Sequence, residues 1–214
     1  MMEETDVVIG ILGGSGLYQM DDVEIINEHE IRTPFGTPSD LICEVVIEER
    51  RVFFLPRHGR DHHLLPTEIP SKANIYALKI LGITHLIAIS ACGIMHDGIK
   101  PGDMVVPNQI FDRTSGDRPS TFFGQGIVGH LSFADPFCNT LREKLLVSSK
   151  MFSEQTYDGG TYLCMEGPLF STRSESNFYR QAVNASVIGM TALPEAKLAR
   201  EAELCYAMLA MGTD

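Results

Sequence analysis

The sequence predicts an α/β fold: a single domain in which a mixed, largely parallel sheet is flanked by helices. Short, continuous apolar runs, typical of strands buried on both faces, alternate with segments that carry apolar residues at helical spacing. The chain has 214 residues, of which 44% are hydrophobic, so it is long enough to bury one sizeable core. No Pro/Gly/Ser-rich linker divides it, and we therefore expect one domain over residues 1–214.

The order of the elements follows from the spacing of apolar residues and from the turns between them. A charged stretch at 48–51 separates two apolar runs, which predicts a hairpin, and Gly82 is a suitable end for the helix before it. We expect strands over 7–12, 41–47, 52–55, 86–89 and 161–165, and helices over 71–81, 136–150 and 174–182. We expect a further pair of strands over 104–106 and 109–111.

The stretch 187–214 predicts a strand, a helix that has Pro194 in its first turn, and a final strand. The apolar face of that helix is expected to consist of Leu198, Ala199, Ala202 and Cys205. Met190 and Thr191 then end one strand, and Asp214 ends the next. Ligands of open α/β sheets collect at the carboxyl ends of strands, so these residues are candidates for a binding site. Thr191 alternatively caps the helix.

The charge and the cysteines favour a soluble cytoplasmic protein. With 28 acidic and 17 basic residues the net charge is −11, which argues against a nucleic-acid or anionic-membrane surface. No apolar run has membrane-spanning length, and the first residues are acidic where a secretory signal would be basic. The cysteines contain no C-x-x-C pair, and we expect all of them to be reduced and inert. They are Cys43, Cys92, Cys138, Cys164 and Cys205.

Two polar segments that follow predicted strands are candidate phosphate sites. The turn Gly13-Gly14-Ser15-Gly16 leaves backbone N–H groups free for an anion, but it lacks the third glycine of a dinucleotide fingerprint, which disfavours an oxidoreductase. It is alternatively a plain tight turn. In the segment 56–63, Arg57 and His58 offer donors to phosphate oxygens. The spacing of His58 and His62 fits a metal only on a helix, so we expect no metal, and a solvated turn is the remaining alternative.

Small residues and an aromatic side chain complete the candidates. The small residues 90–93 would let a ligand approach the backbone closely, although they are equally compatible with tight packing. Phe170, in the Gly-Pro loop 166–170, could stack on a base or form an edge of the core.

Taken in order, these segments resemble the nucleoside phosphorylase superfamily, and specifically its 5'-methylthioadenosine phosphorylase branch. No single match is specific, but they follow the family order over nearly the whole chain. The matching stretches are 9–17, 33–39, 57–60 with His62, 73–75, 91–93, 101–103, 112–114, 166–168, 170–176, and 189–191 with Pro194 and Glu195.

The resemblance implies phosphorolysis of 5'-methylthioadenosine to adenine and 5-methylthioribose 1-phosphate, with inorganic phosphate as co-substrate and no organic cofactor or metal. It also implies a homotrimer or a dimer of trimers, in which His130 reaches the sugar's 5' end from a neighbouring subunit. The phosphate site would consist of Ser15, Arg57, His58, Ser90, Ala91 and Thr191. The nucleoside site would consist of His62, Phe170, Gly189, Met190 and His130.

Asp214 is the candidate catalytic acid. As the glycosidic bond breaks, the purine gathers negative charge, and a carboxylic acid kept neutral by burial could donate a proton or hydrogen bond to purine N7. A carboxylate-type partner also favours a 6-aminopurine over a 6-oxopurine.

The chain departs from the family pattern at three places. Relatives continue past the position of Asp214 with a second acid and a helical region, whereas this sequence stops there; either it is truncated or the protein lacks those parts. Leu169 replaces a usual arginine, and Gly189 replaces an asparagine found in many relatives. A methylthioinosine phosphorylase, a broader purine nucleoside phosphorylase and a non-catalytic nucleoside-binding protein therefore remain alternatives.

Overall fold

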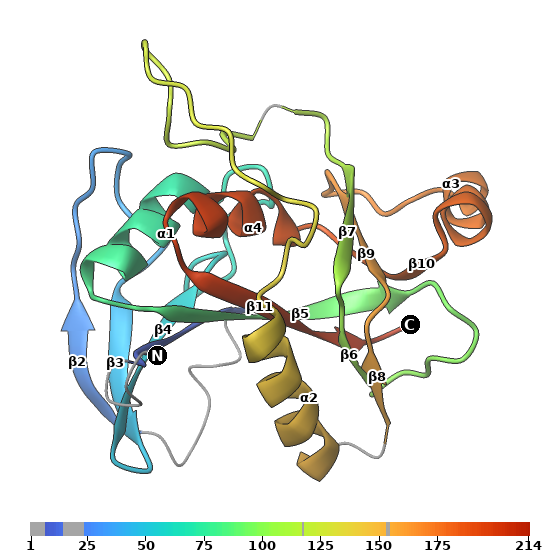
Figure 1. Ribbon diagram of the computed structural model, residues 1–214, viewed down its shortest axis with the longest axis horizontal. Coiled ribbons are helices and arrows are strands. Elements are labelled where there is room, and N and C mark those ends of the chain that lie inside the picture. Colours follow the sequence, from blue (N-terminus) through green and yellow to red (C-terminus); the bar gives the residue numbers. More distant parts are fainter. Residues whose placement is uncertain (1–6, 15–23, 117, 153–154) are drawn as a thin grey trace.

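The computed structural model (Figure 1) describes residues 7–14, 24–116, 118–152 and 155–214. Within these ranges, eleven strands form one mixed sheet that branches at its longest strand, β5 (His85–Ile94). On one side, β5 is parallel to β1 (Ile9–Gly13), which is parallel to β4 (Arg50–Pro56). On the other side it is parallel to β11 (Cys205–Gly212), while its last residues pair antiparallel with β10 (Ala185–Gly189). The predicted fold class is confirmed.

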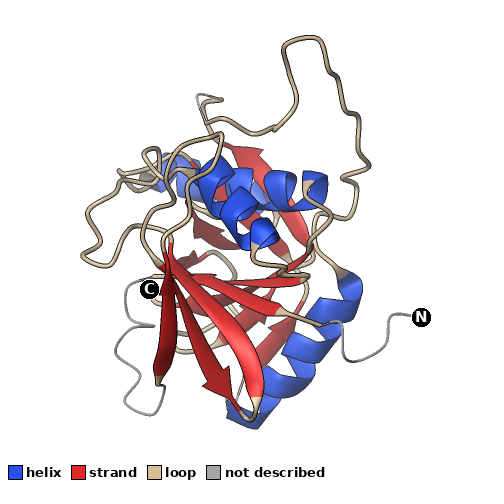
Figure 2. Cartoon of the chain, turned by 90° about the vertical axis from the view of Figure 1, so that its left-hand side faces the viewer, coloured by secondary structure: helices blue, strands red, loops and turns tan. Residues whose placement is uncertain are grey.

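The remaining strands extend this branched sheet at its edges. Beyond β4 lie β3 (Ile42–Ile47) and β2 (Ile25–His29), both antiparallel to their neighbours, and they face the viewer in Figure 2. Beyond β10 lie β9 (Thr161–Met165) and β7 (Gln109–Arg113), both parallel. The third branch runs from β11 to β6 (Met104–Val106) and β8 (Thr156–Asp158).

Helices cover both faces of the sheet. Helices α1 (Ser71–Ile80) and α4 (Ala192–Glu201) lie side by side on one face, and α2 (Asn139–Phe152) packs against β11 on the other. The short helix α3 (Arg173–Phe178) begins at a capping box and continues as a π-helical turn over Tyr179–Val183. The buried core between these layers is apolar, as the predicted patterns require. Its fully buried members include Leu12, Leu55, Leu78, Leu86 and Leu198.

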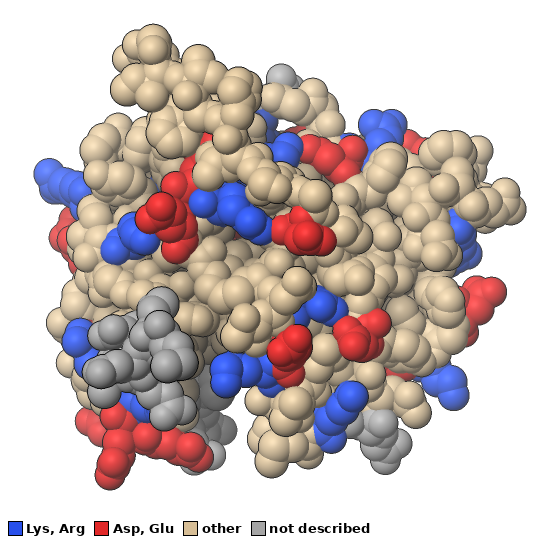
Figure 3. Space-filling model, viewed as in Figure 1, with Lys and Arg blue, Asp and Glu red and all other residues tan. Residues whose placement is uncertain are grey.

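A long connection between β7 and α2 projects from the body of the protein. In Figures 1 and 2 the part that follows residue 118 extends well beyond the sheet and helices. Its side chains include Ile127 and Val128, which are 66% and 77% exposed. Acidic and basic side chains are interspersed over the face shown in Figure 3. No helix in the ranges that the structure describes is both long and apolar enough to span a membrane.

Several predicted elements differ from the observed ones. Residues 104–106 and 109–111 are strands, β6 and β7, but they belong to different branches and do not pair with each other. The predicted helix at 174–182 is divided into α3 and the π-helical turn. Strands β2 and β8 were not predicted, because the exposed β2 and the three-residue β8 carry no clear apolar pattern.

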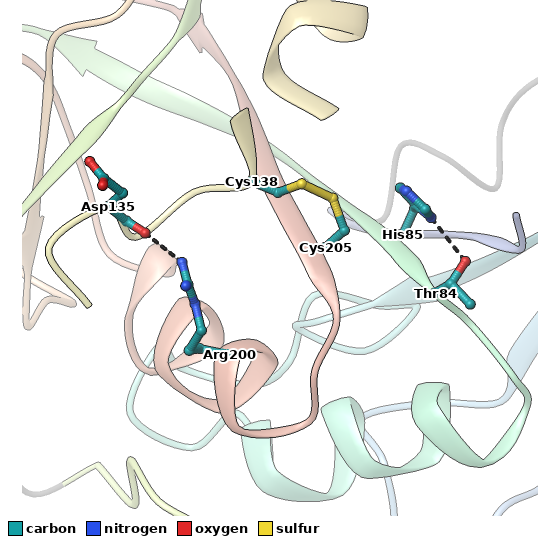
Figure 4. Close-up of a disulfide and its surroundings, with 6 residues drawn as sticks. All are labelled: Thr84, His85, Asp135, Cys138, Arg200 and Cys205. Carbon is teal, nitrogen blue, oxygen red and sulfur yellow. Dashed lines mark hydrogen bonds between the residues drawn. A yellow bond between two sulfur atoms is a disulfide. The ribbon is translucent and has the colours of Figure 1, made fainter. Parts of the chain in front are cut away.

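The prediction that every cysteine is reduced is wrong for one pair. Cys138 and Cys205 form a disulfide with a Cα–Cα distance of 5.2 Å (Figure 4). The prediction also placed Cys205 on the apolar face of the last helix, whereas it is the first residue of β11. Cys43, Cys92 and Cys164 are reduced and buried, as predicted. Because the paired cysteines are 67 positions apart, their spacing alone gives no sign of the bond.

Candidate active site

The carboxyl ends of β4, β10 and β11 and the second half of β5 meet at a cavity of about 660 Å³. This is the location expected for a ligand in an open α/β sheet. The cavity brings together most of the candidate residues from segments far apart in the sequence. The candidates that line it are His58, His62, Ser90, Ala91, Phe170, Gly189, Met190, Thr191 and Asp214.

Two hydroxyl groups form one part of the cavity wall. Ser90 lies within β5 and Thr191 follows β10, and their side-chain oxygens are 3.2 Å apart. Thr191 occupies the N-cap position of α4, but its side chain makes no capping hydrogen bond. Thr191 therefore stands where the capping alternative placed it, but its hydroxyl does not cap the helix. A pair of convergent hydroxyls can donate to the oxygens of a bound anion.

A histidine pair forms the neighbouring wall. His58 Nδ1 donates to the Leu64 carbonyl oxygen at 2.8 Å, and its ring stacks on His62 with centroids 4.4 Å apart. Burial lowers the pKa of His58, the positive charge of Arg57 lowers it further, and the hydrogen bond to Leu64 opposes both effects. His58 is therefore neutral near pH 7, with Nδ1 protonated and Nε2 free to accept a hydrogen bond.

Arg57 is placed differently from the prediction. Arg57 is only 1% exposed, and its guanidinium forms a buried ion pair with Glu195, with Nε and Oε1 2.7 Å apart. It also donates to the carbonyl oxygens of Leu12 and Ile89, and it is absent from the cavity lining. Burial disfavours its charge, but the neighbouring carboxylate raises the pKa of Arg57. Its guanidinium thus joins β1, β5 and α4, with most of its donors bonded to protein groups.

The apolar part of the cavity carries Met190 and Phe170. Gly167 has φ +72°, and a methyl group at this position would overlap the Met190 sulfur. The Gly-Pro loop therefore packs directly against Met190. Phe170 lines the cavity and is 85% exposed, so the loop presents an apolar ring at the cavity mouth; the neighbouring Leu169 is 82% exposed but does not line the cavity.

Arg118 was not predicted, yet it holds this wall in place. It is 8% exposed and donates to the carbonyl oxygens of Met190 and Leu193 at 2.5 and 2.9 Å. It also forms an ion pair with Glu166, with Nε and Oε1 2.9 Å apart. No local pattern identifies this role, because the partners of Arg118 lie 48 to 75 residues further along the chain.

Arg180 is a second residue that the sequence did not single out. It lies in the π-helical turn, lines the cavity, and makes a long hydrogen bond of 3.4 Å to the Ile94 carbonyl oxygen. Exposed cationic side chains are too common for the sequence to distinguish this one.

Asp214 lines the cavity, but its side chain is exposed. Its carbonyl oxygen accepts from the Ile94 N–H at 2.8 Å, and its Oδ1 accepts from the Thr213 hydroxyl at 3.0 Å. These bonds fix the residue beside the end of β5. The burial that was expected to keep its carboxyl group neutral is not provided by the part of the chain that the structure describes.

Of the two remaining candidates, one has no described position and the other lies away from this cavity. Ser15 lies outside the described residues, although Gly13, which precedes it by two positions, accepts a hydrogen bond from the Arg57 N–H at 3.0 Å. His130 is exposed in the projecting connection and does not line the cavity of its own chain. No group of three or more His, Cys, Asp or Glu side chains suited to a metal occurs among the residues with described positions.

Fold and cavity together define an α/β protein whose open site, at the strand ends, offers hydroxyls and a neutral histidine beside apolar side chains. The chain belongs to the phosphorylase superfamily, whose family model matches residues 8–214.

Several known proteins resemble this chain in sequence or in structure. A protein named S-methyl-5'-thioadenosine phosphorylase from Geobacter sulfurreducens is 52% identical over 207 residues, which are 97% of this chain and 72% of that protein. A protein of the same name from Saccharolobus solfataricus is 46% identical, over 100% of this chain and 79% of its own. The crystal structure of a methylthioadenosine phosphorylase from an antarctic soil metagenomic library has a TM-score of 0.92 and 48% identity, covering 97% and 73% of the two chains. The Schistosoma mansoni methylthioadenosine phosphorylase in complex with adenine has a TM-score of 0.90 and 37% identity, covering 97% and 82%.

Proposed function

We propose that this protein catalyses phosphorolysis of 5'-methylthioadenosine, releasing adenine and 5-methylthioribose 1-phosphate. The observation that supports this most directly is one cavity in which the Ser90–Thr191 hydroxyl pair and His58 lie beside Met190, Phe170 and Asp214. The names of its relatives agree with this activity.

The hydroxyl pair and His58 form the proposed phosphate subsite. Ser90 and Thr191 donate to phosphate oxygens, while the unprotonated Nε2 of His58 accepts from the P–OH group of a hydrogen phosphate ion. The bound anion lies beside the sugar and stabilises the positive charge that develops at C1' as the bond to the purine breaks. Phosphate oxygen then bonds to C1' while the base leaves. Backbone donors near Gly14 and the Ser15 hydroxyl would complete this subsite.

Met190 and Phe170 form the proposed nucleoside subsite. Met190 would pack against the ribose and Phe170 against the purine, and Gly189 leaves the wall beside the base without a side chain. Asp214 would accept from the adenine 6-amino group when ionised, or donate toward N7 when protonated. A 6-oxopurine offers an acceptor at the same position, so the ionised carboxylate disfavours it.

A comparison of four substrates tests this function. Purified protein is incubated with phosphate and, separately, with methylthioadenosine, methylthioinosine, adenosine or inosine, and release of free base is followed by chromatography. We expect the highest kcat/KM for methylthioadenosine. A preference for methylthioinosine would reassign the substrate, and binding of all four without any turnover would support the non-catalytic alternative. We propose inorganic phosphate as the only co-substrate, so dialysis against EDTA should leave the rate unchanged.

We further propose that the protein is cytoplasmic and acts as a homotrimer or a dimer of trimers, in which the projecting connection reaches a neighbouring copy. The connection carries His130 together with the exposed Ile127 and Val128, which a second copy would cover. Light scattering should give a mass above that of one chain, and Val128→Asp should lower it. His130→Ala should weaken nucleoside binding without changing that mass. A monomer with full activity would contradict this arrangement.

A further inference from the structure

A buried tyrosine lies directly behind the proposed phosphate subsite. Tyr162 belongs to β9, is 0% exposed, and pairs with Val187 of the neighbouring β10. Its hydroxyl oxygen accepts a hydrogen bond from the Thr191 N–H, at 3.4 Å. Burial raises the pKa of Tyr162 well above its usual range, so the hydroxyl stays neutral. It does not line the cavity itself, and the mechanism above does not use it.

The Tyr162 side chain occupies the space that a side chain at position 189 would need. A methyl group added to Gly189 would overlap the Tyr162 hydroxyl oxygen and would lie 2.7 Å from its Cζ atom. Contacts this short force one of the two groups to move. Gly189 lines the cavity. Because Tyr162 fills the volume that a side chain at position 189 would need, the cavity wall there carries no side chain.

Thr191 connects this tyrosine to the cavity. Its backbone N–H is held by Tyr162, and its side-chain oxygen is 3.2 Å from Ser90 Oγ. The backbone of Thr191 is not helical, with φ −122° and ψ −20°, although α4 begins at the next residue. A hydrogen bond to its N–H therefore restrains the residue at the point where the chain turns from β10 into α4.

We propose that Tyr162 is a positioning residue for the phosphate subsite. Its hydroxyl restrains the Thr191 backbone and so keeps the Thr191 hydroxyl beside that of Ser90. The same hydroxyl leaves room only for glycine at position 189. This inference rests on the proposed function only for the identity of the anion. The arrangement of Tyr162, Gly189 and Thr191 is a property of the fold.

Tyr162→Phe tests the role of the hydroxyl, with the Kd for inorganic phosphate measured by calorimetry and the KM for phosphate as a second readout. Loss of one neutral hydrogen bond corresponds to roughly a threefold to tenfold weaker binding. The KM for the nucleoside should change by less than about twofold, because Met190 and Phe170 are not held by this bond. Tyr157→Phe is the matched control, since its hydroxyl donates to the Gly98 carbonyl oxygen and neither residue lines the cavity.

Gly189→Ala provides an independent test, because it should displace the same hydroxyl. We expect it to weaken phosphate binding at least as much as Tyr162→Phe. The double variant should then be no weaker than Gly189→Ala alone, since the hydroxyl can be lost only once. Effects that multiply in the double variant would contradict a shared mechanism.

The outcomes separate the positioning role from the proposed function. A lower melting temperature with an unchanged Kd for phosphate in Tyr162→Phe would show a purely structural role and overturn the inference. Wild-type protein that binds phosphate but shows no turnover would contradict the proposed activity and leave the binding test intact. Wild-type protein that does not bind phosphate would overturn both.

Discussion

The disulfide allows a stability prediction whose size follows from the chain connectivity. Cys138 directly precedes α2, and Cys205 begins β11, so the bond joins that helix to the strand on which it packs. It closes a loop with a sequence separation of 67 residues. In the chain-entropy model, a loop of this length restricts the unfolded chain by about 4 kcal/mol. That is a large part of the roughly 5–15 kcal/mol that stabilises a typical domain.

The perturbation is the double variant Cys138→Ala and Cys205→Ala, compared with the wild type in denaturant-unfolding experiments with and without reductant. We expect the free energy of unfolding of the oxidised wild type to exceed that of the variant by about 4 kcal/mol. Reductant should lower the stability of the wild type toward that of the variant, and should leave the variant unchanged. Cys43→Ala is the matched control, because Cys43 is not disulfide-bonded and its loss should not alter the response to reductant.

Thiol titration of the denatured protein checks that Cys138 and Cys205 are paired. The oxidised wild type should expose three thiols, those of Cys43, Cys92 and Cys164. If five thiols titrate in the absence of reductant, or if the wild type and the double variant are equally stable, the stability prediction is refuted.

Three further predictions concern residues around the cavity. Glu195→Ala should lower the free energy of unfolding by roughly 3–5 kcal/mol in urea titrations, because it leaves the Arg57 charge buried and unpaired. Gly167→Ala should cost roughly 1–2 kcal/mol from its positive φ and should raise the nucleoside KM by displacing Met190, as steady-state kinetics would show. Because burial lowers the pKa of His58 in the folded protein, the unfolded chain takes up a proton first, and stability should fall as the pH drops below the ordinary histidine pKa of about 6.5, less steeply in His58→Gln.

The parts of the fold that the sequence predicts correctly are those with strong local patterns. The strand at residues 161–165 and the helix ending before Gly82 occur close to their predicted bounds, because buried apolar runs and helix ends are local features. The pairing partners of β6 and β7 were missed because pairing depends on which branch of the sheet a strand joins.

The candidate site shows the same division between local and long-range information. The positions of Met190 and Thr191 were predictable, because residues at strand ends meet at one edge of an α/β sheet. Ser90 reaches the same cavity from within β5, which continues to Ile94 instead of ending at residue 89 as predicted. The direction of the Arg57 side chain was not, since its partner Glu195 lies 138 residues away. For the same reason, the hydrogen bonds of Arg118 leave no signal in its own segment.

The disulfide removes one of the reasons for predicting a cytoplasmic location. Because Cys138 and Cys205 are paired, the cysteines no longer favour a reducing environment.

Release of adenine from methylthioadenosine, measured with and without inorganic phosphate, tests the account most directly. We expect release that saturates with phosphate, with 5-methylthioribose 1-phosphate formed in equal amount and a raised phosphate KM in Ser90→Ala. Adenine release that does not depend on phosphate, or no release at saturating concentrations of both ligands, would contradict it.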